Sequence, residues 1–298
     1  MSVIASVHGV LGAHRYSQEE ITGSFGKIVS PQGKEIPVIA RIHRATALNE
    51  AGLSAEDVDF VMATSVTGVA TPSLEARLVP IVGFRPDVKR VPIFGLGCVA
   101  GAAGIARIHD YLSGHPDDVA VLLSVELCSL TRQSDDVSIA NIIASGLFGD
   151  TAAVVVMVGE RRAVQMRISG PRVIASRSRM YPDTEQMIGW NIGSSGFRIV
   201  LSASVGDVIT RYLGDDMDAF LSDHDLKTTE IEQWVAHAGG PKILQAIEES
   251  LNLRDGQLEA SWHSLYYRRT HCRSALFERL RSRCASNDFA RYAKTTGK

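Results

Sequence analysis

Two residues of this chain, a cysteine and a histidine, stand in settings that suit nucleophilic chemistry. Cys98 lies in the run Gly-Cys-Val-Ala-Gly at residues 97–101, between an apolar segment and a segment of small residues. A thiolate is both a good acyl acceptor and a good leaving group, so a cysteine can take up an acyl group and release it again. His237 lies in the run His-Ala-Gly-Gly-Pro at residues 237–241, and a neighbouring imidazole favours the thiolate. The pair therefore predicts acyl transfer through a thioester.

Each of these residues also has a plainer interpretation. Cys98 can be a small buried hydrophobe, as most cysteines outside disulfides are, and His237 can be a hydrogen-bonded core residue. A helix that begins at Cys98 favours the thiolate by roughly 0.3–1 kcal/mol, or up to ~2 kcal/mol when partly buried. The Gly-Cys-x-x-Gly turn between a strand and a helix of small residues favours the nucleophile, and we expect it at a buried turn.

The elements that must position these residues follow from hydrophobic patterning. Three continuous apolar runs predict strands covered on both faces, as in an α/β fold; they are residues 59–63, 119–125 and 152–158. Four amphipathic segments predict helices; they are residues 73–82, 102–112, 204–213 and 241–251. A further strand is predicted at residues 232–236, which would place His237 at a strand's carboxyl end, where α/β sheets build their sites.

Length and composition give the organisation of the chain. The 298 residues allow two domain-sized units. We expect a first unit at residues 1–158 with the nucleophile, a second at 159–262 with the histidine, and an atypical basic tail at 263–298. Two of the four cysteines lie in this tail.

Charge and hydropathy argue against several classes of function. The net charge of −2 gives no global reason to expect nucleic acid or an anionic membrane as a partner, and no apolar run approaches the ~20 residues of a membrane span. The four scattered cysteines form neither a disulfide framework nor a paired metal-ligand spacing. The first residues lack a signal-peptide pattern, so we expect a reducing, cytoplasmic location.

Four sequence blocks together resemble the chalcone synthase-like family, the type III polyketide synthases, and especially its bacterial members. The blocks are Thr-Ser-Val-Thr-Gly-Val-Ala-Thr-Pro-Ser at 64–73, Gly-Cys-Val-Ala-Gly at 97–101, Leu-Phe-Gly-Asp-Thr-Ala-Ala at 147–153, and His-Ala-Gly-Gly-Pro-Lys-Ile-Leu at 237–244. Their order and spacing fit the family over residues 51–253. The resemblance implies an α/β thiolase-like fold, with two pseudo-repeated halves in an αβαβα layering, and a homodimer.

The resemblance also implies a role for each matching residue. Cys98 would take a starter acyl group from coenzyme A and hold the growing chain as a thioester. His237 would keep Cys98 ionised and stabilise the carbanion formed when malonyl-CoA loses carbon dioxide. Phe148 would be the gatekeeper ring between the coenzyme A tunnel and the chain cavity, with Ile199 as a second, wider gate. The cavity and the dimer seam would be lined by Thr131 and Thr71.

The same resemblance bears on ligands. Arg41 and Arg44 resemble the basic cluster that grips the phosphates of coenzyme A, although ordinary surface charges explain them equally well. The substrates would be acyl-CoA and malonyl-CoA, with no further cofactor and no metal. Asp150, after the Phe-Gly pair, is interpreted as a turn or cap residue.

Two departures from the family pattern stand out. A helical segment is missing just after Arg44. The family's catalytic asparagine, in a Gly-Asn-x-Ser-Ser motif some thirty residues beyond the histidine, has no counterpart here, because that distance reaches residues 269–271, Arg-Thr-His. We therefore expect an incomplete second half, and losing one such donor costs ~10²–10³ in rate.

Three alternatives to a polyketide synthase remain open from the sequence. A ketoacyl-carrier-protein synthase III-like condensing enzyme would use the same cysteine, histidine and asparagine logic. A truncated, catalytically silent remnant would explain the missing motif. A nucleic-acid or membrane contact through the basic tail has the least support, because the tail has few interleaved aromatic residues.

Overall fold

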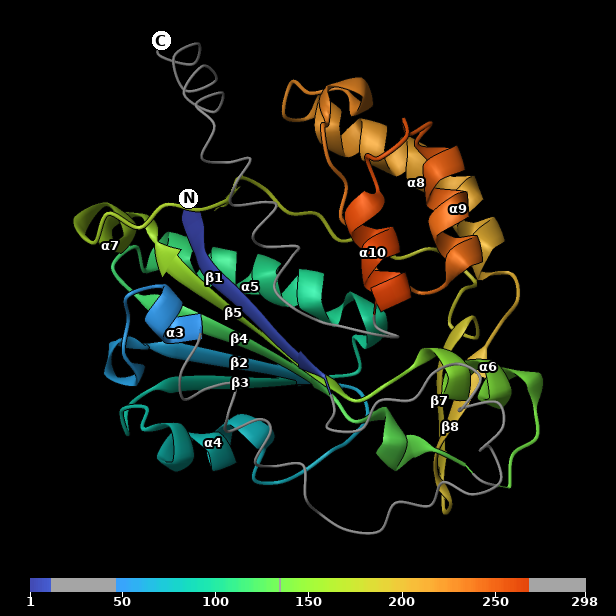
Figure 1. The fold of residues 1–298 in the computed structure, drawn as a ribbon, viewed down its shortest axis with the longest axis horizontal. Coiled ribbons are helices and arrows are strands. Elements are labelled where there is room, and N and C mark those ends of the chain that lie inside the picture. The colour runs from blue at the N-terminus through green and yellow to red at the C-terminus, as the bar shows by residue number, and fades with distance from the viewer. Residues whose placement is uncertain (12–46, 134, 268–298) are drawn as a thin grey trace.

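The computed structural model describes residues 1–11, 47–133 and 135–267, and its main element is a six-stranded mixed sheet (Figure 1). The strands lie in the order β3-β2-β4-β5-β1-β6. β2 is parallel to both β3 and β4, whereas β5 is antiparallel to β4 and to β1. The strand bounds are Ser2–Leu11 (β1), Phe60–Ser65 (β2), Lys89–Phe94 (β3), Val119–Glu126 (β4), Thr151–Gly159 (β5) and Arg172–Val173 (β6).

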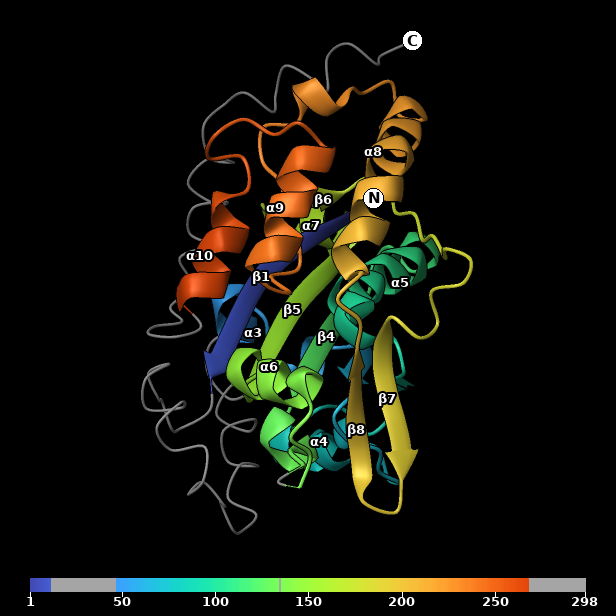
Figure 2. The same cartoon turned by 90° about the vertical axis from the view of Figure 1, so that its right-hand side faces the viewer.

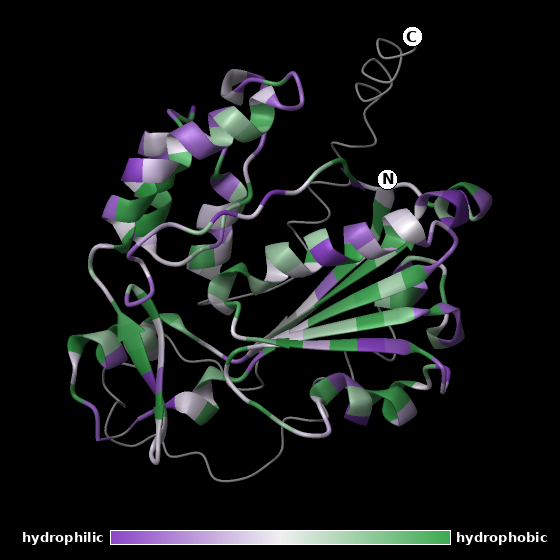
Figure 3. Cartoon of the chain, turned by 180° about the vertical axis from the view of Figure 1, so that it is seen from behind, coloured by the Kyte–Doolittle hydropathy of each residue, from purple (hydrophilic) through white to green (hydrophobic). Residues whose placement is uncertain are grey.

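The centre of the sheet is formed by the three continuous apolar runs of the sequence. β2, β4 and β5 contain these runs, and nearly all of their residues are buried, so the three predicted strands are confirmed. Figure 3 shows these central strands in the hydrophobic colour. β1 was not predicted, because a register shift between Ile4 and Ser6 breaks its alternation of polar and apolar residues.

Helices cover both faces of this sheet. One face packs against α3 (Ala47–Glu50), α4 (Leu74–Val82) and α7 (Glu160–Gln165), and the other packs against α5 (Ala100–Gly114). α5 approaches β4 closely at Gly104, where an added Cβ would lie only 2.6 Å from Cδ1 of the buried Leu122. Glycine at this position therefore fixes the depth at which α5 sits on the sheet.

The second part of the described chain consists of three helices and a hairpin. α8 (Val205–Ser222), α9 (Pro241–Ser250) and α10 (Glu259–Tyr267) pack around their own apolar cluster and stand together in Figure 2. β7 (Ile188–Gly193) and β8 (Gly196–Leu201) form a two-stranded antiparallel sheet. Pro241 begins α9, as its sequence predicts, because the first helical position needs no N–H donor.

The predicted strand at residues 232–236 is wrong. This segment has no regular strand pairing. Its backbone is held instead by the helical end of the chain: Trp234 N donates to Gln257 O at 2.8 Å, and Ala236 N donates to Ser261 Oγ at 2.8 Å. Apolar residues here pack against the helices α8–α10 rather than into a sheet. The segment is therefore apolar because it covers helices, not because it is a buried strand.

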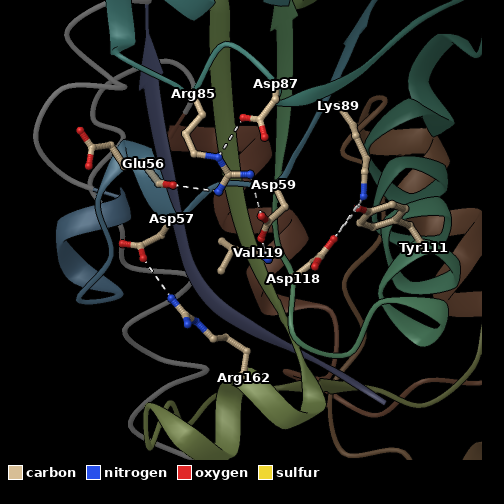
Figure 4. Close-up of polar contacts among 10 residues, drawn as sticks. All are labelled: Glu56, Asp57, Asp59, Arg85, Asp87, Lys89, Tyr111, Asp118, Val119 and Arg162. Carbon is tan, nitrogen blue, oxygen red and sulfur yellow. Dashed lines mark hydrogen bonds and ion pairs between the residues drawn. The ribbon is translucent and has the colours of Figure 1, made fainter.

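Ion pairs gather at the amino ends of the parallel strands (Figure 4). Asp59, just before β2, accepts a hydrogen bond from Val119 N of β4 at 2.8 Å and pairs with Arg85 at 3.0 Å. Arg85 also donates to Glu56 O and to Asp87, each at 3.0 Å. These contacts tie the starts of two strands to the loops around them.

Candidate active site

Cys98 lies at the turn that joins β3 to α5. Gly95 and Gly97 adopt positive φ values of 93° and 59°, a region that favours glycine. Cys98 then lies in a short 3₁₀ turn, η2 (Gly97–Val99), directly before α5. The predicted strand, turn and helix are therefore confirmed, and the thiol stands at the amino end of a 15-residue helix, where the helix dipole favours the thiolate.

The expected burial of this turn is wrong, because Cys98 is exposed. The small residues at the start of α5 differ in their surroundings: Gly104 lies closely against Leu122 of β4, whereas an added Cβ at Gly101 would meet no atom within 4 Å. Small residues suit a buried helix, and this was the basis for expecting the turn to be buried. Within the described part of the chain, only the face of α5 turned toward the sheet is covered.

His237 follows an extended segment and precedes α9, and its side chain is exposed. Gly239 N donates to His237 O at 2.9 Å, and an added Cβ at Gly239 would lie 3.3 Å from His237 Cδ2. Gly240 has a φ of 146°, and an added Cβ there would lie 3.8 Å from Cδ1 of Leu147. The two glycines thus bring the histidine turn against the residue before Phe148.

Phe148 and Ile199 lie on two neighbouring elements. Phe148 caps α6 (Ile139–Leu147), is half-buried, and donates its N–H to Ala144 O at 2.8 Å. Ile199 lies in β8 opposite Trp190 of β7, and α6 packs against β8. The two predicted gate residues are therefore carried by adjoining elements.

An aromatic chain joins this hairpin to the strand that leads to Cys98. The rings of Trp190 and Phe197 are 5.9 Å apart between centroids, and those of Phe197 and Phe94 are 6.3 Å apart. Phe94 is the last residue of β3. Phe197 and Ile199 share one face of β8, since side chains alternate along a strand. The cysteine turn and the histidine turn thus both adjoin the unit formed by α6 and the β7–β8 hairpin.

The remaining predicted site residues are divided. Thr131 is buried, and its Oγ1 donates to Cys128 O at 3.0 Å, whereas Thr71 is exposed. Asp150 accepts hydrogen bonds from Ser129 N at 2.8 Å and Ser129 Oγ at 2.7 Å, which is the capping role predicted for it. The two predicted coenzyme A contacts and the position expected for the catalytic asparagine lie outside the described residues; they are Arg41, Arg44 and residues 269–271.

Glu126 is a residue of this region that the sequence analysis missed. It ends β4, and its carboxylate accepts hydrogen bonds from Val66 N at 3.1 and 3.2 Å and from Thr67 Oγ1 at 2.9 Å. Burial raises the pKa of the Glu126 carboxyl above its usual value, and these donors lower it in part. The available signal was a lone acid at the end of an otherwise apolar strand.

Glu126 lies at the carboxyl edge of the parallel strands, the edge at which β3 leads into the Cys98 turn. Open α/β sheets place their ligand sites at this edge. Among the described residues there is no group of three or more His, Cys, Asp or Glu side chains arranged to hold a metal ion. In the same residues, no helix has the length and apolar character needed to cross a membrane.

Comparison with known proteins gives a consistent result. The family described as "Chalcone and stilbene synthases, N-terminal domain" matches residues 18–161, and the corresponding C-terminal domain matches residues 172–292. A 1,3,6,8-tetrahydroxynaphthalene synthase of Streptomyces peucetius subsp. caesius is 44% identical over 303 aligned positions, which cover 88% of this chain and 80% of that protein.

Two further relatives extend the comparison. A putative chalcone synthase of Bacillus subtilis is 35% identical over 69% of this chain, but the match spans only 57% of that protein's length. The crystal structure of the 1,3,6,8-tetrahydroxynaphthalene synthase of Streptomyces coelicolor has the same fold, with a TM-score of 0.77 at 23% identity, covering 94% of this chain and 90% of that one. The chain therefore belongs to the chalcone and stilbene synthase family, the type III polyketide synthases, and has their thiolase-like α/β fold.

Proposed function

We propose that this chain builds a polyketide on Cys98 from coenzyme A thioesters, with malonyl-CoA as the extender. The observation that carries the proposal is the exposed thiol at the start of α5, in a chain 44% identical to a tetrahydroxynaphthalene synthase. Tetrahydroxynaphthalene carries its oxygens on alternate carbons, as a chain of two-carbon malonyl units does. We therefore propose an aromatic polyketide as the product class.

The chemistry needs one nucleophile and no redox step. The Cys98 thiolate attacks the carbonyl of the acyl-CoA, the carbon–sulfur bond to coenzyme A breaks, and the coenzyme A thiolate takes up a proton. Malonyl-CoA then loses carbon dioxide, and the resulting enolate carbon attacks the Cys98 thioester. This step releases the Cys98 thiolate and leaves a β-ketoacyl-CoA that is two carbons longer. Because the thioesters supply the activated carbon, no other cofactor is required.

His237 is the residue proposed to favour the Cys98 thiolate and to donate to the developing enolate oxygen. Phe148 and Ile199 are proposed as the gates of the chain cavity, and the adjoining positions of α6 and β8 support this assignment. The sequence lacks the Gly-Asn-x-Ser-Ser motif of the family. We therefore expect turnover ~10²–10³ below that of a relative with all three groups, because one preorganised donor contributes about that much.

The experiment that tests this proposal is acyl loading followed by intact-mass measurement. The wild-type chain is incubated with a panel of acyl-CoA thioesters and malonyl-CoA, and the adduct is mapped by peptide mass spectrometry. We expect one acyl group on Cys98 and none in Cys98→Ala. Cys128→Ala is the matched control, because Cys128 is the other described cysteine and does not form a disulfide with Cys98; it should load as the wild type does.

Two outcomes would contradict the proposal. If no acyl-CoA loads Cys98, the chain is a catalytically silent remnant. If loading and extension require substrates attached to a carrier protein, the chain acts as a ketoacyl-carrier-protein synthase III-like enzyme. Loading without extension would retain the acyltransferase half and would locate the defect in the decarboxylation step.

We also propose that the enzyme is a homodimer. β3 is the edge strand of the six-stranded sheet, and Val91 and Phe94 on it are 37% and 44% exposed. Beside the strand, Leu96 and Val99 in the Cys98 turn are also exposed. Exposed apolar side chains gathered in this way are typical of a contact with another chain. Because Lys89, Arg90 and Pro92 on β3 oppose pairing of strand edges, we propose that the contact is made by side chains. Light scattering after size-exclusion chromatography should give twice the chain mass, and a monomer at working concentration would contradict this.

A further inference from the structure

One buried amide, that of Gln133, holds the turn of the β7–β8 hairpin. Gln133 lies between β4 and α6, is 9% exposed, and its Nε2 donates to Ser195 O at 2.9 Å and to Phe197 O at 3.3 Å. Gly196, between these two acceptors, has a φ of 92°, and an added Cβ there would lie 3.6 Å from Gln133 Nε2. The side chain therefore sits directly against the backbone of the turn.

A second buried amide holds the main chain of Gln133 to α6. Asn141, 6% exposed, lies in the first turn of α6, and its Nδ2 donates to Gln133 O at 2.9 Å and to Asp136 O at 2.6 Å. We call Gln133 and Asn141 the amide clamp. Asn141 on α6 binds the main chain of Gln133, and the side chain of Gln133 binds the hairpin that contains β8. The side chain of Gln133 reaches one element and its main chain is bound to the other.

A further polar contact between the described part of this loop and the hairpin is exposed. Arg198 on β8 pairs with Asp135 at 2.8 Å, and their side chains are 37% and 67% exposed. Exposed ion pairs contribute little, because water and salt screen them, whereas a buried donor left without its acceptor carries its full desolvation penalty. A two-stranded hairpin is marginally stable by itself. The amide clamp is therefore a buried polar contact that holds the hairpin turn to the loop before α6, beside the aromatic packing of Phe197.

We propose that Gln133 is a positioning residue for product length, because the amide clamp sets the spacing between Phe148 at the end of α6 and Ile199 on β8. This inference rests on the proposed function, in which these two side chains bound the growing chain. Ile199 lies two residues beyond Phe197, whose carbonyl oxygen accepts a hydrogen bond from Gln133 Nε2. A shift of the hairpin relative to α6 changes the room beside the chain and so the number of malonyl units that fit. Gln133 touches no substrate in this scheme and acts only through the two elements.

The test compares wild type with Gln133→Leu, which keeps the approximate size of the side chain and removes its donor. Two quantities are measured on the full chain: hydrogen exchange of the amides of residues 188–201, by mass spectrometry, and the ratio of products differing in malonyl units. We expect exchange in the hairpin to rise about tenfold, as for a loss of one buried hydrogen bond, and the product ratio to shift. Acyl loading of Cys98 should persist.

Two control variants separate positioning from general stability. Gln257→Leu removes another buried amide, 8% exposed, whose Nε2 donates to Ile231 O at 2.6 Å; its melting temperature should fall, but exchange in residues 188–201 should not change. Asp135→Asn removes only the negative charge of the exposed partner of Arg198, and it should leave both the exchange and the product ratio as in wild type.

The outcomes distinguish this inference from the proposed function. Unchanged exchange of the hairpin in Gln133→Leu would overturn the positioning role, even in an active enzyme. Raised exchange with an unchanged product ratio would overturn the link to product length. If the wild type makes no product, the proposed function fails together with that link, whereas the exchange measurement still decides whether Gln133 holds the hairpin.

Discussion

At the scale of single residues, Glu126 combines burial with a position at the carboxyl edge of the parallel strands. Its carboxylate is bound by a backbone amide and a hydroxyl that follow β2, namely Val66 N and Thr67 Oγ1. Burial outweighs these donors and raises the pKa of the carboxyl. The folded chain therefore holds this proton more tightly than the unfolded chain does.

The first prediction concerns the pH dependence of stability. Between the unfolded pKa and the raised folded pKa of Glu126, the folded state binds more protons, so the free energy of unfolding falls as pH rises through this window and stays lower above it. Glu126→Gln lacks this titration. The melting temperature of wild type minus that of Glu126→Gln should therefore decrease as the pH rises above the ordinary pKa of a glutamate carboxyl.

A second variant checks the cause of this dependence. Thr67→Val removes a donor that lowers the Glu126 pKa, so in this variant the fall in the free energy of unfolding should extend to higher pH than in wild type. If the difference in melting temperature between wild type and Glu126→Gln is the same at every pH, burial of Glu126 does not shift its titration.

At the scale of elements, the junction of β5 and α7 is limited by a backbone contact. Gly159 ends β5, and its N–H donates to Asp118 O at 3.0 Å. An added Cβ there would lie 2.4 Å from Pro116 O, a backbone atom that cannot rotate away. The φ of Gly159 is −63°, which any residue adopts, so the constraint is one of space alone.

The second prediction follows from this contact. Gly159→Ala should destabilise the fold by about 2–3 kcal/mol, the upper part of the usual range for single substitutions, because β5 or the loop at Pro116 must move. Gly206→Ala is the matched control: it lies in the first turn of α8, and an added Cβ would meet no atom within 4 Å. It should stabilise by roughly 0.5–1 kcal/mol. Equal effects in chemical denaturation would contradict the steric argument.

The sequence predicted those elements whose pattern is local. The strands β2, β4 and β5 were found because continuous apolar runs need no knowledge of a partner, and the Cys98 turn was found because Gly95 and Gly97 mark positive φ. Residues 232–236 were assigned wrongly, since the same apolar pattern packs against helices. The exposure of Cys98 was missed because burial depends on what covers α5.

Long-range polar contacts were beyond prediction for a related reason. Gln133 and its acceptor Ser195 O are 62 residues apart, and Glu126 and Val66 are 60 apart. A glutamine or glutamate in isolation gives no pattern that names such a partner. The candidate nucleophile and histidine were recognisable because they lie in short motifs, whereas Gln133 and Glu126 contact residues far away in the sequence.

At the scale of the whole molecule, the two ends of the parallel strands carry different residues. The amino ends hold the ion pairs of Asp59 and Arg85, and the carboxyl ends hold Glu126 and lead to Cys98. A strand of six residues, such as β2, separates them by roughly 20 Å, at about 3.3 Å a residue. Changes at the amino ends should therefore alter stability without altering the chemistry.

The third prediction tests this separation. Asp59→Ala removes the acceptor of Val119 N and should cost about 1–3 kcal/mol, because a buried donor is left unsatisfied. Asp59→Asn keeps an oxygen for Val119 and loses only the pair with Arg85, whose side chain is 36% exposed; it should cost less than about 1 kcal/mol. Acyl loading of Cys98 below the melting temperature should be the same in both. Loss of loading in folded Asp59→Asn would contradict the separation.

The ion pairs at the amino ends have a consequence for how the protein can change over generations. In the proposed function the growing chain is held at Cys98, beyond the opposite end of the strands, and most substitutions around it would lower stability. Additional or stronger pairs around Arg85 can offset that loss without contacting the substrate. Extra stability gained at the amino ends of the strands would therefore allow destabilising substitutions that change starter or product preference. Laboratory evolution of this protein should begin by strengthening the contacts around Arg85.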